Sequence, residues 1–115
     1  MTARTRASGF HEAFCADLPD AEAAFMAISQ RPLSGVAFGE KAPTPAWRTR
    51  PSWAVLPAAD GAIHPDVHRF SYDRMGATVT VVEGASHVVM LSRPAVVADV
   101  VREAVRTCAP GGLHS

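Results

Sequence analysis

Hydrophobic positions in the second half of the chain follow two spacings, one typical of buried strands and the other of helices. Residues 53–56 and 78–82 are continuous runs of apolar or β-branched residues, as in strands that are buried on both faces. Between these runs, Pro65 and Asp66 suit the first turn of a helix and Gly76 suits its C-terminal cap. The apolar positions expected on the buried face of this helix are Val67, Phe70 and Met75.

A second helix follows the second predicted strand. Ser92 suits its N-terminal cap and Pro94 its first turn. Its apolar positions have helical spacing and are Val97, Val100, Val101, Ala104 and Val105. Residues 53–108 are therefore predicted to form a strand–helix–strand–helix unit, followed by a tail over 109–115.

The first 40 residues show helical spacing and predict no strand. Residues 1–9 are small and polar and are expected to be disordered, whereas 10–40 form a helical segment. Asp17 suits an N-cap with Pro19 in the first turn, and residues 33–38 suit one helical turn. The stripe expected to pack in this segment is Leu18, Ala21, Phe25 and Ile28. Residues 41–52 are rich in proline and read as a connector.

Composition favours one folded domain and excludes several classes of partner. The chain has 115 residues, 48% of them hydrophobic, so it is not disordered. With 11 basic and 11 acidic residues, it does not have the charge expected for binding nucleic acid or an anionic membrane. We see neither a membrane span nor a signal peptide. Cys15 and Cys108 are predicted to be free thiols in a reducing cytoplasm, with a disulfide as the alternative.

An acid and a histidine each follow a predicted strand. Asp60 comes after residues 53–56, and His87 comes after 78–82. Alone, Asp60 beside Gly61 reads as a turn former, and His87 as an ordinary loop histidine. Ligands and chemistry collect at the carboxyl ends of strands in open α/β sheets. Together, the two residues therefore indicate an acid–base pair.

Three segments resemble the C-terminal part of an α/β-hydrolase. They are DGAIHPDVHRF, GATVTVVEGASHVVMLSRP and the closing valine-rich helix. The upstream segment FHEAFCADLPDAEAAFMAISQRPLSGVAF resembles part of the cap of such an enzyme. The resemblance is closest to esterase-like members related to salicylate and methyl-ester esterases, and it covers residues 10–105. It implies a partial α/β fold, with cap helices followed by the last two parallel strands and their helices.

The resemblance also implies roles for individual residues. Asp60 matches the acid and His87 the general base of a serine–acid–histidine triad, acting on a small carboxylic ester without a cofactor. Trp53 would lie in the core of the penultimate strand. The residues implied to line or support a substrate pocket beneath the cap are Phe14, Phe25, Met26 and Trp47.

The third member of the triad is absent from these residues. A hydrolase of this family carries its nucleophile in a G-x-S-x-G turn between a strand and a helix. No serine of the chain has this pattern; its serines are Ser8, Ser29, Ser34, Ser52, Ser71, Ser86, Ser92 and Ser115. A general base without a nucleophile contributes almost nothing to the rate, so the chain is expected to be inactive alone.

The histidines also allow two other kinds of chemistry. His64 and His68 are four residues apart, which suits two metal ligands on one helix face, with Asp60 or Asp66 as a third. The closed set of ligands that zinc needs is missing, so we predict no metal and interpret these histidines as part of a solvated face. Ser86 is adjacent to His87, and its side chain would point away from the imidazole.

Three functional hypotheses remain. The chain is an inactive hydrolase fragment, or half of a split esterase completed by a chain with the N-terminal half of the fold, or a non-catalytic binding or oligomerisation module. Two strands are too few for a stable sheet, and apolar strands with uncovered edges favour pairing with another chain or with a second copy. A partner with a G-x-S-x-G segment would favour the split esterase.

Overall fold

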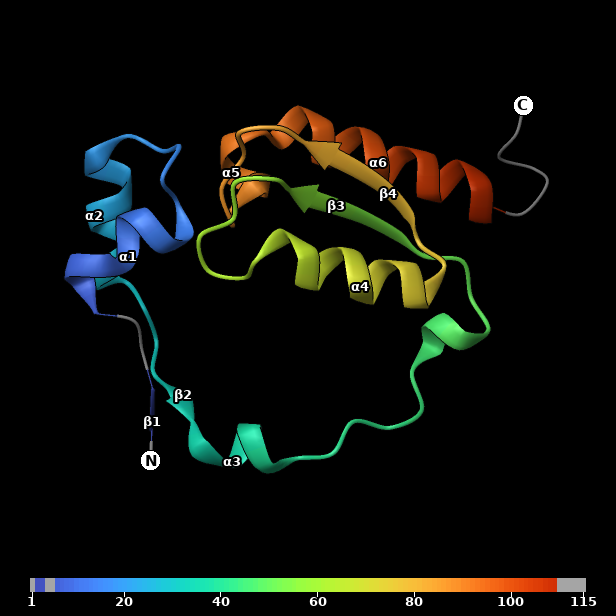
Figure 1. Ribbon diagram of the computed structural model, residues 1–115, viewed down its shortest axis with the longest axis horizontal. Coiled ribbons are helices and arrows are strands. Elements are labelled where there is room, and N and C mark those ends of the chain that lie inside the picture. Colours follow the sequence, from blue (N-terminus) through green and yellow to red (C-terminus); the bar gives the residue numbers. More distant parts are fainter. Residues whose placement is uncertain (1, 4–5, 110–115) are drawn as a thin grey trace.

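The computed structural model of the protein describes residues 2–3 and 6–109, and it divides into two parts that are joined by a long connector (Figure 1). The N-terminal part contains β1 (Thr2–Ala3), α1 (Ala7–Phe14), α2 (Asp20–Ile28), β2 (Leu33–Ser34) and α3 (Gly35–Gly39). The connector holds one 3-10 turn, η1 (Ala46–Arg48). The C-terminal part contains β3 (Trp53–Pro57), α4 (Pro65–Met75), β4 (Thr78–Val82), α5 (Val89–Ser92) and α6 (Pro94–Cys108).

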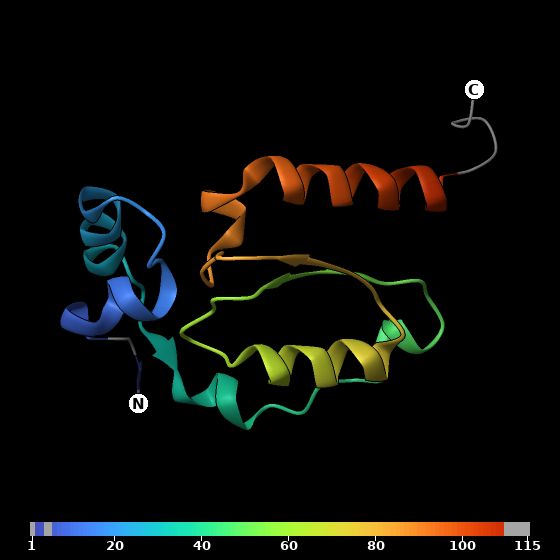
Figure 2. The ribbon, with the colours of Figure 1, turned by 45° about the horizontal axis from the view of Figure 1, so that its top comes forward.

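The C-terminal part is a parallel strand pair between two helices. β3 and β4 pair in register from Trp53 opposite Thr78 to Pro57 opposite Val82. The strand pair lies between α4 and α6, as Figure 2 shows. A right-handed crossover through a helix is the usual way to join neighbouring parallel strands. The predicted strand–helix–strand–helix unit and the α/β fold class are confirmed.

The loops that follow the two strands are held together by the backbone. The N–H of Ala58 donates to the carbonyl of Val82 at 3.0 Å, just beyond the ladder. The N–H of Ala59 then donates to the carbonyl of Ala85 at 2.9 Å. The loops that carry Asp60 and His87 therefore leave the sheet side by side.

The N-terminal part differs from the sequence-based expectation in three respects. It contains a two-residue antiparallel ladder between β1 and β2, where no strand was predicted. Helix α1 begins at Ala7, so residues 7–9 are helical, while Met1, Arg4 and Thr5 lie outside the described residues. Pro19 occupies the N-cap of α2 because the side chain of Asp17 is engaged elsewhere.

The buried core is small, and several predicted core residues are exposed. Helix α2 buries Ala23 and Ala27, whereas Phe25 and Ile28 face outward. On α4, Val67 and Phe70 are 55% and 71% exposed, so the prediction that they face the core is wrong. The main packing partner of α4 is β3, which in Figure 2 lies on the other side of the helix from the open lower edge of the molecule.

Two further predictions concern helix ends and cysteines. Arg93, not Ser92, is the N-cap of α6, because residues 89–92 form the separate short helix α5. Cys15 is buried and Cys108 exposed, and both are free thiols, as predicted. None of the described helices combines the length and the apolar character that crossing a membrane requires.

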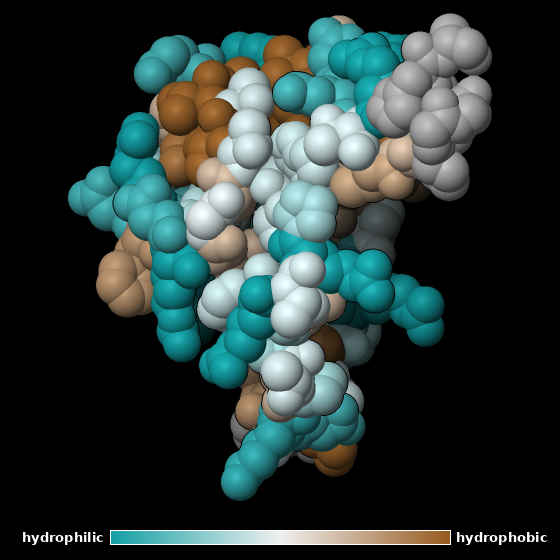
Figure 3. Space-filling view, turned by 90° about the vertical axis from the view of Figure 1, so that its right-hand side faces the viewer, coloured by the Kyte–Doolittle hydropathy of each residue, from teal (hydrophilic) through white to brown (hydrophobic). Residues whose placement is uncertain are grey.

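The molecule is open rather than spherical. Its radius of gyration is 16.6 Å, against about 13 Å for a compact domain of this length. A shallow apolar groove of about 690 Å³ runs between β3 and α6 and includes Trp53, Val55, Met75, Val97 and Val101. Seen from the end where α6 finishes, hydrophobic side chains gather in an upper patch above a mostly hydrophilic lower part (Figure 3).

Candidate active site

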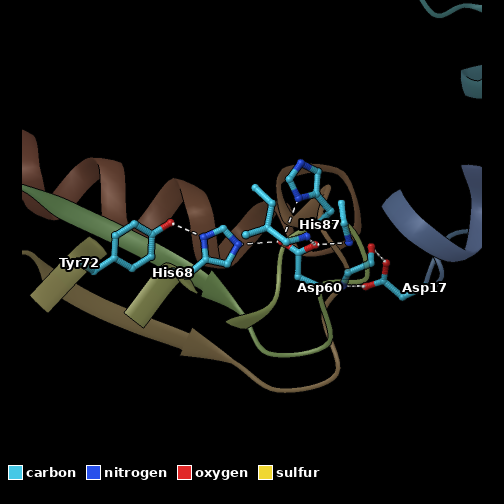
Figure 4. A network of polar contacts seen from close by, with 8 residues as sticks. Asp17, Asp60, His68, Tyr72 and His87 are labelled. Carbon is cyan, nitrogen blue, oxygen red and sulfur yellow. Dashed lines mark hydrogen bonds and ion pairs between the residues drawn. The ribbon is translucent and has the colours of Figure 1, made fainter. Parts of the chain in front are cut away.

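Asp60 lies in the loop after β3 and has a buried carboxyl group. Its Oδ1 accepts hydrogen bonds from the backbone N–H groups of Ala62 at 2.8 Å and Ile63 at 3.0 Å. Asp60 therefore forms the turn expected of an Asp-Gly pair, and this turn uses only one of its two oxygens. The other oxygen, Oδ2, is directed toward the loop after β4 and toward α4 (Figure 4).

His87 lies in the loop after β4 and contacts the second oxygen of Asp60. Its Nδ1 is 2.9 Å from Oδ2. The His87 and Phe14 rings form a T-shaped pair at a centroid distance of 5.3 Å, and the N–H of Val88 donates to the carbonyl of Phe14. The side chain is 31% exposed, and Nε2 has no hydrogen-bond partner among the described residues. His87 therefore has one nitrogen held by an acid and the other available.

His68 on α4 also contacts Asp60, which the sequence interpretation missed. Its Nε2 lies 2.8 Å from the same Oδ2, and its side chain is only 14% exposed. The prediction of a solvated face is therefore wrong for His68, although His64 is exposed and caps the helix through Asp66 N–H. The sequence did contain a signal for this contact: His68 lies in the first turn of the predicted helix, and this helix begins at Pro65, shortly after Asp60.

The carboxyl group of Asp60 is strongly acidic in this setting. Burial alone would raise its pKa, but hydrogen bonds from His68, Ile63 N–H, His87 and Ala62 N–H outweigh it and lower the pKa from 3.8 to about 2. Asp60 is thus ionised at neutral pH and can only accept hydrogen bonds. The neutral His87 ring must then carry its proton on Nδ1, so that Nε2 presents a lone pair.

A second acid ties the N-terminal part to the site. Asp17, in the loop between α1 and α2, accepts hydrogen bonds from the N–H and the hydroxyl of Ser86 and from Arg93 Nη1 at 3.3 Å. Burial opposes ionisation of Asp17, but the hydrogen bonds from the hydroxyl and the backbone N–H of Ser86 favour the ionised form, and the pKa of Asp17 is lowered. The Ser86 hydroxyl is therefore occupied by Asp17, which disfavours it as a nucleophile for His87.

The predicted pocket residues are placed differently from one another. Phe14 contacts His87, whereas Phe25 and Met26 line a pocket of about 420 Å³ that also includes Leu18, Glu22 and Leu91 but neither Asp60 nor His87. Trp47 is not brought to this group. The connector carries it to the opposite end of α4, where the Arg74 guanidinium lies 5.8 Å from its ring centroid. Substrate contact by these residues stays a prediction.

A metal site is not supported by the described residues. Residues 6–109 contain no cluster of three or more His, Cys, Asp or Glu side chains arranged to hold a metal ion. Instead, one nitrogen of His68 and one nitrogen of His87 lie at hydrogen-bond distance from the Asp60 carboxylate. The arrangement suits proton transfer by His87, supported by a buried anion.

Comparison with known proteins identifies the family. A model described as the alpha/beta hydrolase family matches residues 2–100, which is most of the 115-residue chain. No curated protein and no solved structure matches the sequence. The chain therefore belongs to the α/β hydrolase family, and its strand pair and helices form a partial version of that fold, as the sequence predicted.

Proposed function

We propose that this α/β hydrolase family member supplies the acid, Asp60, and the general base, His87, of a serine-type hydrolase of carboxylic esters. The observation that carries the proposal is the Nδ1–Oδ2 contact of 2.9 Å together with an available Nε2. Catalysis of this kind needs a base whose tautomer is held by an acid. The serine and the oxyanion donors come from a polypeptide segment outside these 115 residues, because the chain contains no G-x-S-x-G turn.

In the first step, Nε2 of His87 takes the proton of the serine hydroxyl as its oxygen attacks the ester carbonyl carbon. The imidazolium that forms lies against the Asp60 carboxylate, which stabilises the positive charge. His87 then gives the proton to the departing alkoxide, which leaves as an alcohol. In the second step, His87 takes a proton from water as the water oxygen attacks the acyl carbon, and it returns this proton to the departing serine oxygen, so that the carboxylic acid is released and the serine is restored.

Apolar surroundings support an ester as the substrate class. Phe14 packs against His87, and a separate pocket lined by Phe25 and Met26 is apolar apart from Glu22. An uncharged acyl or alcohol group would bury apolar surface there, and no cationic side chain among the described residues contacts His87 to favour an anionic substrate.

The proposal is tested by supplying the missing serine. The isolated chain is expected to show no turnover of p-nitrophenyl acetate above a histidine background and no serine labelling by a fluorophosphonate. Mixing it with a polypeptide that carries the earlier strands and the G-x-S-x-G turn should restore hydrolysis. In the mixture, His87→Ala should lower turnover by about 10⁴-fold or more and Asp60→Asn by a similar factor.

His64→Asn is the matched control for these variants. His64 is exposed and contacts neither Asp60 nor His87, and asparagine keeps the helix cap. This variant should retain wild-type turnover in the mixture. If His87→Ala also retained it, or if the isolated chain were labelled stoichiometrically at one serine, the proposal would be wrong.

A non-catalytic binding or oligomerisation module is the second candidate. The observation in its favour is the uncovered apolar surface on β4 and α6, where Val79, Val81 and Val101 are partly exposed. A stable dimer of this chain that blocks association with any serine-bearing segment would favour the module over the hydrolase.

A further inference from the structure

We propose that His68 is a positioning residue of the site, which holds the Asp60 carboxylate for His87 and lowers the proton affinity of the His87 ring. The inference rests on the proposed function of His87 as a general base. It is carried by the convergence of two imidazole nitrogens on one buried oxygen, at 2.8 Å from His68 and 2.9 Å from His87 (Figure 4).

His68 completes the hydrogen bonding of the carboxylate. Two backbone N–H groups occupy Oδ1 and two imidazoles occupy Oδ2. A carboxylate has about four acceptor positions, so this group has little capacity left and little freedom to rotate. Without His68, Oδ2 would keep only its hydrogen bond with His87. The carboxyl group of Asp60 could then rotate more easily about the Cβ–Cγ bond.

The direction of each proton follows from the charge on Asp60. Because the carboxylate can only accept, a neutral His68 donates from Nε2 and has a lone pair on Nδ1. The Tyr72 hydroxyl lies 3.5 Å from that Nδ1, and the two rings stack at 5.6 Å. Tyr72, one turn further along α4, thus supports the tautomer that points a donor at Asp60.

Sharing an oxygen changes the basicity of His87. An oxygen that already accepts one N–H stabilises a neighbouring imidazolium less than an unshared carboxylate oxygen does, since part of its charge is already compensated. His68 thereby takes up part of the charge of Asp60 that would otherwise face His87 alone, and a general base needs a free lone pair on its ring. In the described part of the chain, the ionisable groups in contact with either ring are Asp60 and Tyr72, and α1 contributes the apolar Phe14.

Two amide substitutions separate this role from a merely structural one. In His68→Gln the amide reaches about as far as Nε2 and can still donate to Asp60. In His68→Asn it reaches about as far as Nδ1, on the Tyr72 side, and cannot. Both variants are uncharged and polar, and His64→Asn controls for the loss of an imidazole elsewhere on the same helix.

The readout is the proton affinity of His87 in the isolated chain. It is obtained from the rate of diethyl pyrocarbonate modification of His87 against pH, followed by peptide mass spectrometry, which does not depend on oligomer size. We expect His68→Asn to raise this affinity by about three- to tenfold. His68→Gln and His64→Asn should stay close to wild type.

An unchanged His87 affinity in a folded His68→Asn chain would overturn the inference, as would an equal rise in His68→Gln. Circular dichroism checks folding; if His68→Asn loses helix, His68→Leu takes its place, since leucine fills the site without a donor. The measurement needs no ester turnover. A shifted His87 with failed reconstitution would therefore count against the proposed function alone, and an unshifted His87 with restored activity against this inference alone.

Discussion

Asp60 is the residue on which the candidate site depends. Its buried carboxyl group accepts hydrogen bonds from its own turn, from α4 and from the loop after β4. Asp60 can therefore both form the turn and contact the histidines, because the turn uses Oδ1 and the histidines use Oδ2. A buried anion with this many donors is a strong acid and also a structural anchor.

The pH dependence of stability should show this anchor. The folded pKa of Asp60 is about 2, below its ordinary value of 3.8. The folded chain therefore binds this proton less tightly than the unfolded chain does. The stabilisation is complete above pH 4 to 5 and is lost as the pH falls through the folded pKa, at a cost of about 2 kcal/mol.

Urea unfolding at several pH values between 7 and 2 measures this effect. Other acids titrate in the same range, so the difference between the wild type and Asp60→Asn isolates the contribution of Asp60. We expect this difference in unfolding free energy to shrink toward low pH. A difference that stays constant from pH 7 to 2 would show that the hydrogen bonds do not favour the ionised form.

At the scale of elements, the end of α1 is packed directly on the acid loop. A Cβ atom at Gly61 would lie 2.9 Å from the Glu12 carbonyl and 3.1 Å from that of Ala13. The same helix end presents Phe14 to His87 and bonds to Val88 N–H. Helix α1, the loop after β3 and the loop after β4 thus meet at one point, and Asp17 ties the following loop to Ser86.

A pair of glycine substitutions tests this contact. Gly61→Ala should destabilise the chain by about 1–3 kcal/mol, because backbone atoms of α1 have to move away. Gly9→Ala is the control: it lies within α1 with no atom near its Cβ position, so it should be neutral or stabilise by up to about 1 kcal/mol. Thermal unfolding compares the two. Equal stabilities for both variants would argue against the packing of α1 on the acid loop.

At the scale of the whole molecule, much of the apolar surface lacks a covering layer. The groove between β3 and α6 is open, and Val101 and Val105 are each 56% exposed. The outer face of α4 presents Val67 and Phe70. Surface of this kind drives association.

We therefore expect the purified chain to self-associate. Light scattering should report a mass above that of the 12.2 kDa monomer. Val101→Lys, which places a charge in the groove, should lower the average mass by roughly twofold or more. Arg102→Lys is the control, since this exposed position is already charged. A monodisperse wild-type monomer with cooperative unfolding would contradict the expectation.

The sequence by itself determined the features that depend on local spacing. The apolar runs at 53–56 and 78–82 are strands, and Pro65 and Gly76 bound α4. The order of these elements places Asp60 and His87 at one edge of the sheet, because parallel strands end on the same side. Local spacing was thus enough to predict that the acid and the histidine lie together, whereas the family followed from the resemblance of whole segments and from the family match.

Only the tertiary structure decided contacts between distant segments. His68 reaches Asp60 because α4 is rotated so that this residue, and not Phe70, faces the sheet edge. Asp17 accepts a hydrogen bond from Ser86, 69 residues away along the chain, and Pro19 rather than Asp17 is the N-cap of α2. Spacing along a helix predicts which residues share a face, but the neighbour that packs against the helix decides which face is buried. Within the described part of the chain, α4 packs on β3 and α2 on α1 through other faces, and Val67, Phe70 and Phe25 are exposed where their spacing predicted a core.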